Sequence, residues 1–182
     1  MFKKIDFSLD LVGSPFENLR YRDRTVLIFI KNSKDRYLFG VKKFYPNEIK
    51  RMIGGGVDKD EEVLEAAVRE IQEELEISVL QSELQSLLEF NITGKYKGEV
   101  FNTSIFTCYL DIGDKTYNPG DDVSAVAEFT RVECQKIAGE MAKVSETSFF
   151  ENGENSFSWA DYGKVYGFVL KESLRVLRDS IV

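Results

Sequence analysis

Three glutamates within about one helical turn are the residues of this sequence best suited to chemistry. Glu70, Glu73 and Glu74 lie in the stretch GGGVDKDEEVLEAAVREIQEELEI, which spans residues 54–77. Like charges three or four residues apart destabilise a helix by about 0.2–0.5 kcal/mol per pair. The cluster is therefore either a solvated acidic face or a site that holds a cation. Carboxylates prefer hard cations such as Mg²⁺, Ca²⁺ and Mn²⁺.

Two features of the same stretch favour the cation site. Arg69 is the only basic residue between Asp60 and Ile77, so Lys and Arg do not balance the acidic side chains. Three successive glycines, beginning at Gly54, precede the helix and allow backbone to come close to a ligand or ion. Convergent carboxylates beside an exposed backbone turn are what a magnesium or manganese site requires.

The composition narrows the chemistry available to such a site. The 182-residue chain contains no histidine, which excludes Ser-His-Asp and Cys-His catalysis and metal sites built on imidazole. Its net charge of −7 argues against a nucleic-acid polymer as partner, because such binding rests on a basic surface. A small phosphorylated ligand is compatible with this charge if a cation bridges it to the carboxylates.

The sequence also predicts a cytoplasmic protein with no membrane partner. No apolar run approaches the roughly 18 residues that span a bilayer. The N-terminus begins with basic residues, as secretory signals do, but Asp6 and Asp10 interrupt its apolar stretch. Cys108 and Cys134 are too few for the disulfide framework typical of a small secreted domain. Cys108 lies in the apolar run SIFTCYL and is expected to be a core residue.

The elements that must position the glutamates follow from hydrophobic periodicity. The order of these elements predicts an α/β (α+β) fold with a mixed sheet covered by helices. The helix of the glutamates is expected to bury Leu64, Val68, Ile71 and Leu75, with the three acids on a different side. Asp58 or Asp60 is expected to cap it. The predicted strands are residues 25–30, 37–42, 84–93, 99–110 and 124–133, the predicted helices are 61–75, 134–144 and 164–182, and 148–163 is a predicted loop.

The spacing of the acidic stretch resembles the Nudix box. That motif reads glycine, five residues, Glu, seven residues, Arg-Glu, an aliphatic residue, any residue, Glu-Glu, any residue, glycine and an aliphatic residue. Its positions correspond here to Gly55, Glu61, Arg69 to Glu74 and Ile77, while Glu76 replaces the final glycine. The resemblance implies a Nudix hydrolase with an α/β/α sandwich. It also implies one domain over residues 1–182, with a core at about 23–144 and terminal extensions packed on it.

The resemblance implies a role for each residue of the box. Glu70, Glu73 and Glu74 would hold one or more Mg²⁺ ions, or Mn²⁺ as a substitute, with a carbonyl of Gly54 or Gly55 adding a ligand. Arg69 would pair with a nearby glutamate, such as Glu73, and fix its rotamer. Glu61 would support the geometry of the loop and helix or join the outer metal shell.

The implied reaction is Mg²⁺-dependent hydrolysis of a nucleoside diphosphate linked to another moiety, with water attacking phosphorus. Glu70, Glu73 and Arg69 are the catalytic residues implied within the box. Glu128 is a candidate base or further metal ligand, and Asp121, Asp122 and the box glutamates are its rivals. The alternative is a catalytically degenerate Nudix module that binds a nucleotide or a protein partner. Many relatives form homodimers, and the oligomeric state stays open.

Residues outside the box leave the substrate open. Trp159, Phe157 and Phe150 either stack on a nucleobase or pack beneath the terminal helix. Glu76 in a left-handed conformation would cost about 1–2 kcal/mol, so the helix is expected to run on or to exit differently. The basic candidates for phosphate contact, each of which is otherwise a solvated charge, are Arg24, Lys42, Lys43 and Arg51.

Overall fold

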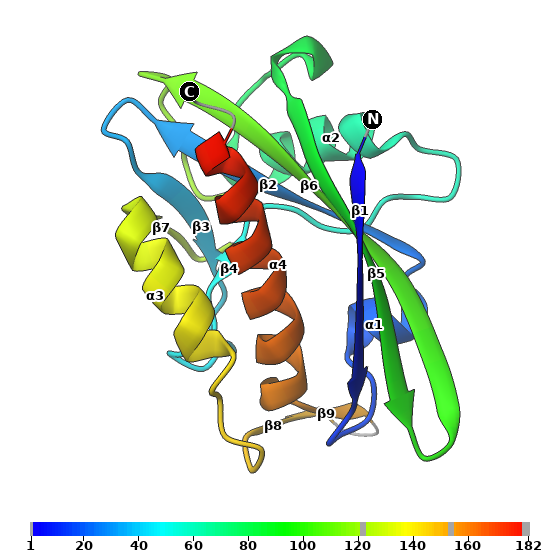
Figure 1. Ribbon diagram of the computed structural model, residues 1–182. Helices are drawn as coiled ribbons and strands as arrows, with labels where there is room; N and C mark the ends of the chain where they lie inside the picture. Colours follow the sequence, from blue (N-terminus) through cyan, green and yellow to red (C-terminus); the bar gives the residue numbers. More distant parts are fainter. Residues whose placement is uncertain (1, 121–122, 153–154, 180–182) are drawn as a thin grey trace.

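A mixed sheet lies between two layers of helices in this computed structural model, which describes residues 2–120, 123–152 and 155–179 (Figure 1). The helices are α1 (Glu17–Tyr21), α2 (Val63–Leu75), α3 (Arg131–Met141) and α4 (Trp159–Asp179), with a 3₁₀ turn, η1, at Gln81–Glu83. The main sheet contains β1 (Lys3–Asp10), β2 (Arg24–Asn32), β3 (Tyr37–Val41), β4 (Arg51–Met52), β5 (Gln85–Tyr96), β6 (Glu99–Gly113) and β7 (Ala125–Phe129). A separate hairpin consists of β8 (Phe149–Asn152) and β9 (Asn155–Ser158).

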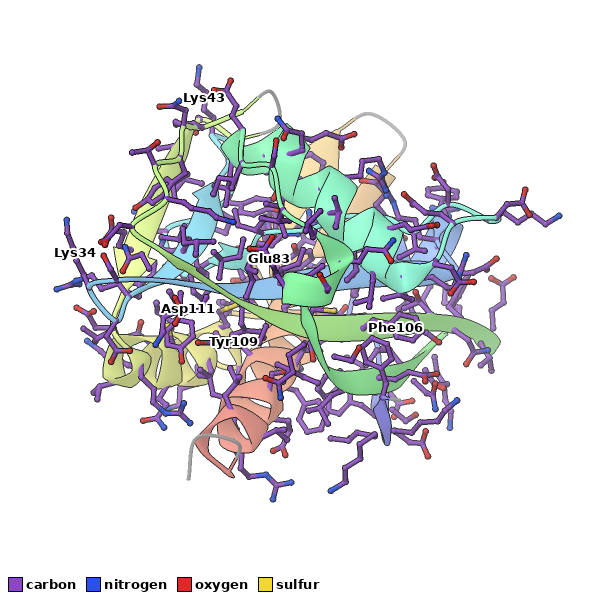
Figure 2. The ribbon with its side chains drawn as sticks, turned by 90° about the horizontal axis from the view of Figure 1, so that it is seen from above. Lys34, Lys43, Glu83, Phe106, Tyr109 and Asp111 are labelled. Carbon is purple, nitrogen blue, oxygen red and sulfur yellow. The ribbon has the colours of Figure 1, made fainter. Side chains whose placement is uncertain are left out.

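The strand order of the main sheet is β1-β5-β6-β2-β3-β4, and β7 pairs with β3. The pairs β1–β5 and β2–β6 are parallel, whereas β5–β6, β2–β3, β3–β4 and β3–β7 are antiparallel. Seen from above, α2 lies on one side of the strands and α3 and α4 lie on the other (Figure 2). The predicted α/β class, with its mixed sheet flanked by helices in an α/β/α sandwich, is confirmed.

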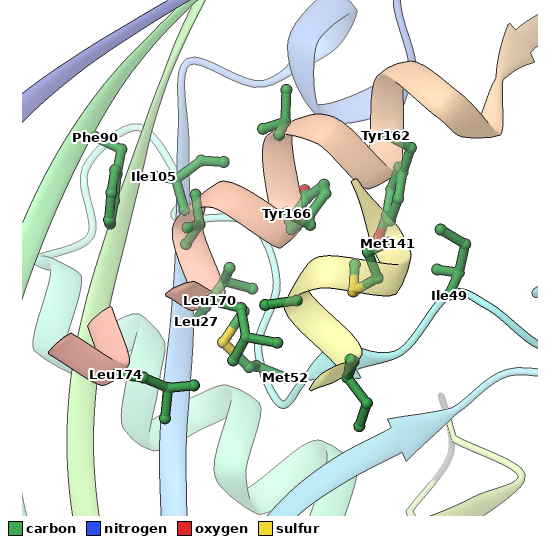
Figure 3. Packing of buried hydrophobic residues seen from close by; sticks show 14 of the residues in the cluster. Leu27, Ile49, Met52, Phe90, Ile105, Met141, Tyr162, Tyr166, Leu170 and Leu174 are labelled. Carbon is green, nitrogen blue, oxygen red and sulfur yellow. The ribbon is translucent and has the colours of Figure 1, made fainter. Parts of the chain in front are cut away.

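The middle of strand β2, residues 26–30, is apolar, as expected for a strand whose two faces are both buried. Val26, Ile28 and Ile30 pack in the cluster beneath α2, and Leu27 and Phe29 pack in the cluster beneath α3 and α4. None of these five side chains is more than 1% exposed. Figure 3 shows the second cluster, in which side chains of α4 such as Tyr166 and Leu170 lie beside the strand that carries Leu27.

Helix α2 is rotated relative to the predicted stripe. Ile71 and Leu75 are fully buried as expected, but Leu64 and Val68 are only partly buried at the margin. Ala66 and Ala67 occupy the centre of the contact, because their small side chains let the helix backbone approach the sheet. This rotation turns two of the three glutamates inward.

The start of α2 also differs from the prediction of an aspartate cap. Glu62 occupies the N-cap position, and its backbone N–H donates to the carboxylate of Glu65 at 3.1 Å. The N–H of Asp58 donates instead to Glu61 Oε2 at 3.1 Å. The acidic first turn therefore caps itself, as a capping box does.

The predicted loop 148–163 is wrong, because it contains a hairpin and the beginning of α4. Phe150 and Phe157 are cross-strand partners in this hairpin, and their rings stack at 5.1 Å. The hydroxyl of Ser158 accepts a hydrogen bond from Ala160 N at 3.1 Å. This bond satisfies a backbone donor at the start of α4, and the helix begins at Trp159 rather than at residue 164.

The N-terminal segment adds β1 and α1, neither of which was predicted. Residues 3–10 of β1 pair in parallel with residues 88–95 of β5, a long-range contact that leaves no local sequence signal. Cys108 and Cys134 are free and buried, as expected for the first of them. Across the described part of the chain, every helix is too short or too polar to cross a membrane.

Candidate active site at the glutamate helix

The glycine turn before α2 is held against β2 and touches two of the glutamates. Val26 N donates to Gly55 O at 2.9 Å, and Gly54 N donates to Glu74 Oε2 at 2.9 Å. Gly54 has φ +136°, and a Cβ there would lie 2.1 Å from the Val26 carbonyl oxygen. A Cβ on Gly55 would lie within 2.6 Å of the carboxylate of Glu70. Only glycine lets this turn contact both the strand and the carboxylates.

Glu70 and Glu74 face this turn and are buried, which corrects the prediction that they lie well away from the core face. Their relative exposures are 7% and 3%, whereas the side chain of Glu73 is 51% exposed. Burial raises the pKa of both Glu70 and Glu74 above the usual value for Glu, and nearby arginines oppose the shift. These two carboxyls therefore sit in an environment that favours a compensating positive charge.

Arg69 supplies positive charge to three of the acids at once. Its Nε and Nη2 donate to the two carboxylate oxygens of Glu61, each at 3.0 Å. Its Nη1 lies 2.7 Å from Glu70 Oε1 and 3.1 Å from Glu73 Oε2. Nη2 also donates to the carbonyl of Gly56 at 2.8 Å. The pairing of Arg69 with Glu73 is thus present, and Glu61 serves as the second anchor of the guanidinium.

Carboxylate oxygens of Glu70 and Glu73 converge on Arg69 Nη1, so two acidic side chains of α2 already share one positive charge. In the described segments, no group of three acidic or cysteine side chains is already arranged as a metal site. The donors are carboxylate oxygens beside a glycine turn, and the chain has no imidazole to offer. The chemistry of this donor set fits a hard divalent cation such as Mg²⁺.

The carbonyl of Gly54, a predicted metal ligand, accepts a hydrogen bond from Arg51 Nη2 at 2.7 Å. Arg51 Nη1 lies 3.5 Å from the hydroxyl of Tyr45, and its Nε is buried with no partner within the described residues. Glu74 lies close enough to Arg51 for each charge to shift the pKa of the other. Arg51 therefore adjoins the backbone and the carboxylate of the candidate site.

Glu128 lies in β7 opposite Leu38, and its contacts differ from those of the Arg69 cluster. It accepts a hydrogen bond from the hydroxyl of Tyr117, which lowers its pKa below the usual value. Tyr117 belongs to a loop that packs on the end of α2, where Gly120 N donates to Glu74 O at 3.0 Å. The rival bases Asp121 and Asp122 follow this loop but lie outside the described residues.

The end of α2 contradicts the expectation that the helix runs on past Glu76 or exits without a left-handed residue. The helix stops at Leu75, and Glu76 adopts a left-handed conformation with φ 56° and ψ 31°. The side chain of Asn118 donates to Glu76 Oε2 at 3.2 Å, and Asn118 N donates to Leu75 O at 3.1 Å. The chain therefore leaves the helix as the family's glycine would allow, and the following loop supports the strained residue.

The basic and aromatic residues predicted to contact phosphate or a nucleobase lie in different places: Arg24 makes structural contacts, Lys43 is exposed, and the rest line a pocket. Arg24 donates to the carbonyls of Asp58, Lys59 and Glu61, so it holds the loop before α2. Lys43 points outward into solvent (Figure 2). The others line one pocket together, namely Lys42, Arg51, Phe150, Phe157 and Trp159.

Comparison with known proteins identifies a family whose sequence pattern this chain matches. A sequence profile of the NUDIX domain matches residues 21–148, whereas no curated protein sequence matches the chain. The solved structure of a Caenorhabditis elegans Ap4A hydrolase is 16% identical with a TM-score of 0.51, covering 87% of this chain and 96% of that one. A Bacillus halodurans MutT protein is 18% identical with a TM-score of 0.53, covering 63% of this chain and 72% of that one.

Two further similarities differ in how much of the other protein they cover. The Escherichia coli dihydroneopterin triphosphate pyrophosphohydrolase is 19% identical with a TM-score of 0.50, covering 64% of this chain and 86% of that one. A MutT/nudix family protein from Enterococcus faecalis is matched over only 46% of its own length, with a TM-score of 0.48. Because the NUDIX profile spans more than half of this sequence, the chain belongs to the Nudix hydrolase family.

Proposed function

We propose that this protein hydrolyses a diphosphate bond in a nucleoside diphosphate derivative and that Mg²⁺ or Mn²⁺ is required. The observation that carries the proposal is the convergence of Glu70 and Glu73 on Arg69 Nη1 beside a glycine turn. Two proteins of similar fold are named for hydrolysing Ap4A and dihydroneopterin triphosphate, which supports a small phosphorylated substrate.

Glu70, Glu73 and Glu74 would hold the cation, with the carbonyl of Gly54 as a further ligand. A bound Mg²⁺ supplies charge neutralisation for the diphosphate oxygens and lowers the pKa of a bound water. The buried Glu70 and Glu74 lie in a low-dielectric environment, which strengthens their attraction for the cation. Arg69, anchored by Glu61, keeps the carboxylates of Glu70 and Glu73 in position.

The attacking water must lose a proton to a carboxylate. Glu73 is our first candidate, because its half-exposed side chain can face both the site and solvent. Glu128 is our second candidate, because the hydrogen bond from Tyr117 lowers its pKa and keeps the carboxylate ionised and able to accept a proton. Tyr117 connects Glu128 to the loop that contacts α2, so the two candidates belong to adjoining elements.

A hydrolysis screen with Mg²⁺ and Mn²⁺ tests the proposed reaction. It covers nucleoside triphosphates, ADP-ribose, dinucleoside polyphosphates and sugar nucleotides, with release of phosphate or nucleoside monophosphate as the signal. Glu73→Gln should lower kcat/KM by about 100-fold or more, because even outer-shell partners of a metal contribute 10–100-fold. Glu140→Gln, at an exposed position on α3, is the matched control and should remain active.

The alternative, a degenerate module that binds without turnover, predicts binding but no metal-dependent product. Titration of Mn²⁺ into the wild type and into Glu73→Gln/Glu74→Gln tests the proposed metal ligands, and the hydrolysis screen distinguishes the enzyme from the degenerate module. Equal affinity of both proteins for Mn²⁺ would count against the proposed ligands. Metal binding by the wild type with no product from any nucleotide would favour the degenerate module.

We also propose that residues 1–182 act as one cytoplasmic domain with a small-molecule partner. The support for one domain is that β1 joins the main sheet and α4 packs on its core, although both extend beyond residues 21–148. The support for a cytoplasmic location, where thiols stay reduced, is that Cys108 and Cys134 are free and buried. Limited proteolysis that released a stable 21–148 core from flexible ends would contradict the single domain.

A further inference from the structure

A pocket of about 720 Å³ lies beside Arg51, apart from the glutamates of α2. Its walls come from α1, the segment before β4, the β8–β9 hairpin and the first turn of α4. Figure 1 shows α1 and this hairpin toward the same end of the molecule, and an isolated bridge joins Ser14 to Phe157. A cavity of this size is within the range that holds small-molecule ligands.

Most of the wall lies outside the segment that matches the family profile. Phe16 and Asn18 precede residue 21, and Phe157, Trp159 and Tyr162 follow residue 148. The Nudix box, residues 55–77, contributes no lining residue to this pocket, and most of the wall comes from the terminal elements of the chain.

More than half of the residues that line the pocket are aromatic. Phe44 is 56% exposed, and its ring lies 4.9 Å from that of Tyr45 and 5.6 Å from that of Phe150. Trp159 lies behind them, 5.6 Å from Tyr45 and 5.9 Å from Phe150. An exposed ring backed by an ordered aromatic cluster is suited to stacking on a planar ligand.

The charges around the pocket favour an anionic ligand, although the chain as a whole is acidic. Arg20, Lys42 and Arg51 line it, and the lining acid Glu17 pairs with Arg22 at 3.2 Å. Lys42 and Arg51 come from the segment that leads into the glycine turn. A planar ring that carries negative charge at one end satisfies both the aromatic and the basic walls.

Arg51 connects this pocket to the candidate active site. It lines the pocket, and its Nη2 donates to the carbonyl of Gly54 at 2.7 Å. Gly54 N in turn donates to Glu74 at 2.9 Å. Arg51 Nε is buried and has no partner among the described residues, so Nη1 and Nη2 make the hydrogen bonds of this guanidinium.

We propose that this pocket is the nucleobase subsite of the substrate, with the ring against Phe44 and the phosphates leaving past Arg51 toward Gly54. The assignment of the bound nucleotide as substrate rests on the proposed function. The binding itself does not, because stacking and the basic residues need neither the cation nor turnover.

Trp159 is the only tryptophan of the chain, so its fluorescence reports on the pocket. The probes are AMP, GMP, CMP and UMP, which carry no diphosphate bond to hydrolyse, and they are titrated with EDTA present so that no divalent cation contributes to binding. At least one should change the fluorescence saturably. Phe44→Ala should raise its Kd by about 5- to 150-fold, the range that loss of one base–aromatic stack gives. Phe149→Ala removes a ring that is 42% exposed and does not line the pocket, and should leave Kd unchanged.

Absence of a saturable change with all four nucleotides would overturn the proposal. So would equal Kd values for Phe44→Ala and the wild type. Glu73→Gln separates the two proposals, because it should bind the nucleotide as the wild type does while hydrolysis is lost. If binding is intact but no nucleotide is hydrolysed, the proposed function fails and the subsite stands. If hydrolysis occurs and Phe44→Ala leaves KM unchanged, the subsite fails and the function stands.

Discussion

Arg69 and Glu61 form a two-point ion pair in which Nε–Oε1 and Nη2–Oε2 are both 3.0 Å. The pair joins α2 to the loop before it, and the side chain of Glu61 is only 17% exposed. It fixes the plane of the guanidinium, and Nη1 is thereby directed at Glu70 and Glu73. The ion pair is thus a positioning device for the carboxylates of the candidate active site.

Arg69→Lys should be a damaging replacement despite its retained charge. A single ammonium cannot reproduce a planar fork that contacts Glu61, Glu70, Glu73 and Gly56 together. We expect the free energy of unfolding in urea to fall by about 1–3 kcal/mol. Lys136→Ala, which removes an exposed pair with Glu140, should change it by less than about 0.5 kcal/mol. Equal stabilities of the two variants would contradict the positioning role.

Glu76→Gly should preserve or raise stability although it removes a side chain. A left-handed non-glycine residue costs about 1–2 kcal/mol, but glycine gains entropy in the unfolded chain and the contact with Asn118 is lost. We expect a net gain of about 0–1 kcal/mol in thermal unfolding. Glu76→Ala keeps the strain and loses the contact, so it should be less stable than the wild type. A glycine variant less stable than the alanine variant would refute this account of the helix end.

Gly54→Ala and Gly55→Ala should fail in different ways. At Gly54 a Cβ meets backbone at 2.1 Å in a left-handed conformation, so unfolding free energy should fall by about 1–3 kcal/mol. At Gly55 the three atoms nearest to the added Cβ all belong to the carboxylate of Glu70, the end of a flexible side chain that can move. Gly55→Ala should therefore fold nearly normally but bind Mn²⁺ more weakly in a calorimetric titration. Wild-type metal affinity in folded Gly55→Ala would argue against Glu70 as a ligand.

Glu128→Gln should lower stability in a manner that depends on pH. The hydrogen bond from Tyr117 lowers the pKa of Glu128 in the folded state below its usual value of 4.5. A carboxyl whose pKa is lowered in the folded state contributes its full stabilisation at pH values above its unfolded pKa. This stabilisation is lost as the pH falls through the folded pKa. The wild type should therefore be more stable than Glu128→Gln at pH 7, and the gap should narrow below about pH 4.5.

Urea unfolding of both proteins between pH 7 and pH 3 measures this gap. Tyr117→Phe supplies the control, since it removes the donor and should remove most of the pH-dependent difference. A gap that widens on acidification would show that Glu128 is destabilised by its surroundings. The same Glu128→Gln protein, assayed for hydrolysis, ranks Glu128 against Glu73 as the base.

The elements that depend on local pattern could be predicted from the sequence. The β2–β3 hairpin, α2 and the long strands β5 and β6 occupy the predicted segments, because side-chain periodicity and turn residues act over short distances. The residue spacing from Gly55 to Ile77 likewise identifies the Nudix box, because the motif consists of one turn followed by one helix. Fold class and family thus followed from residues close together in the chain.

Only the tertiary structure decided what surrounds those residues. Glu70 and Glu74 are buried because α2 turns Ala66 and Ala67 toward the sheet. The periodicity of the larger apolar side chains predicted a different buried face for this helix. The parallel pairing of β1 with β5 and the pocket beside Arg51 join segments far apart in sequence. Such contacts form because the whole core packs at once, and this packing leaves no pattern in any single stretch of the chain.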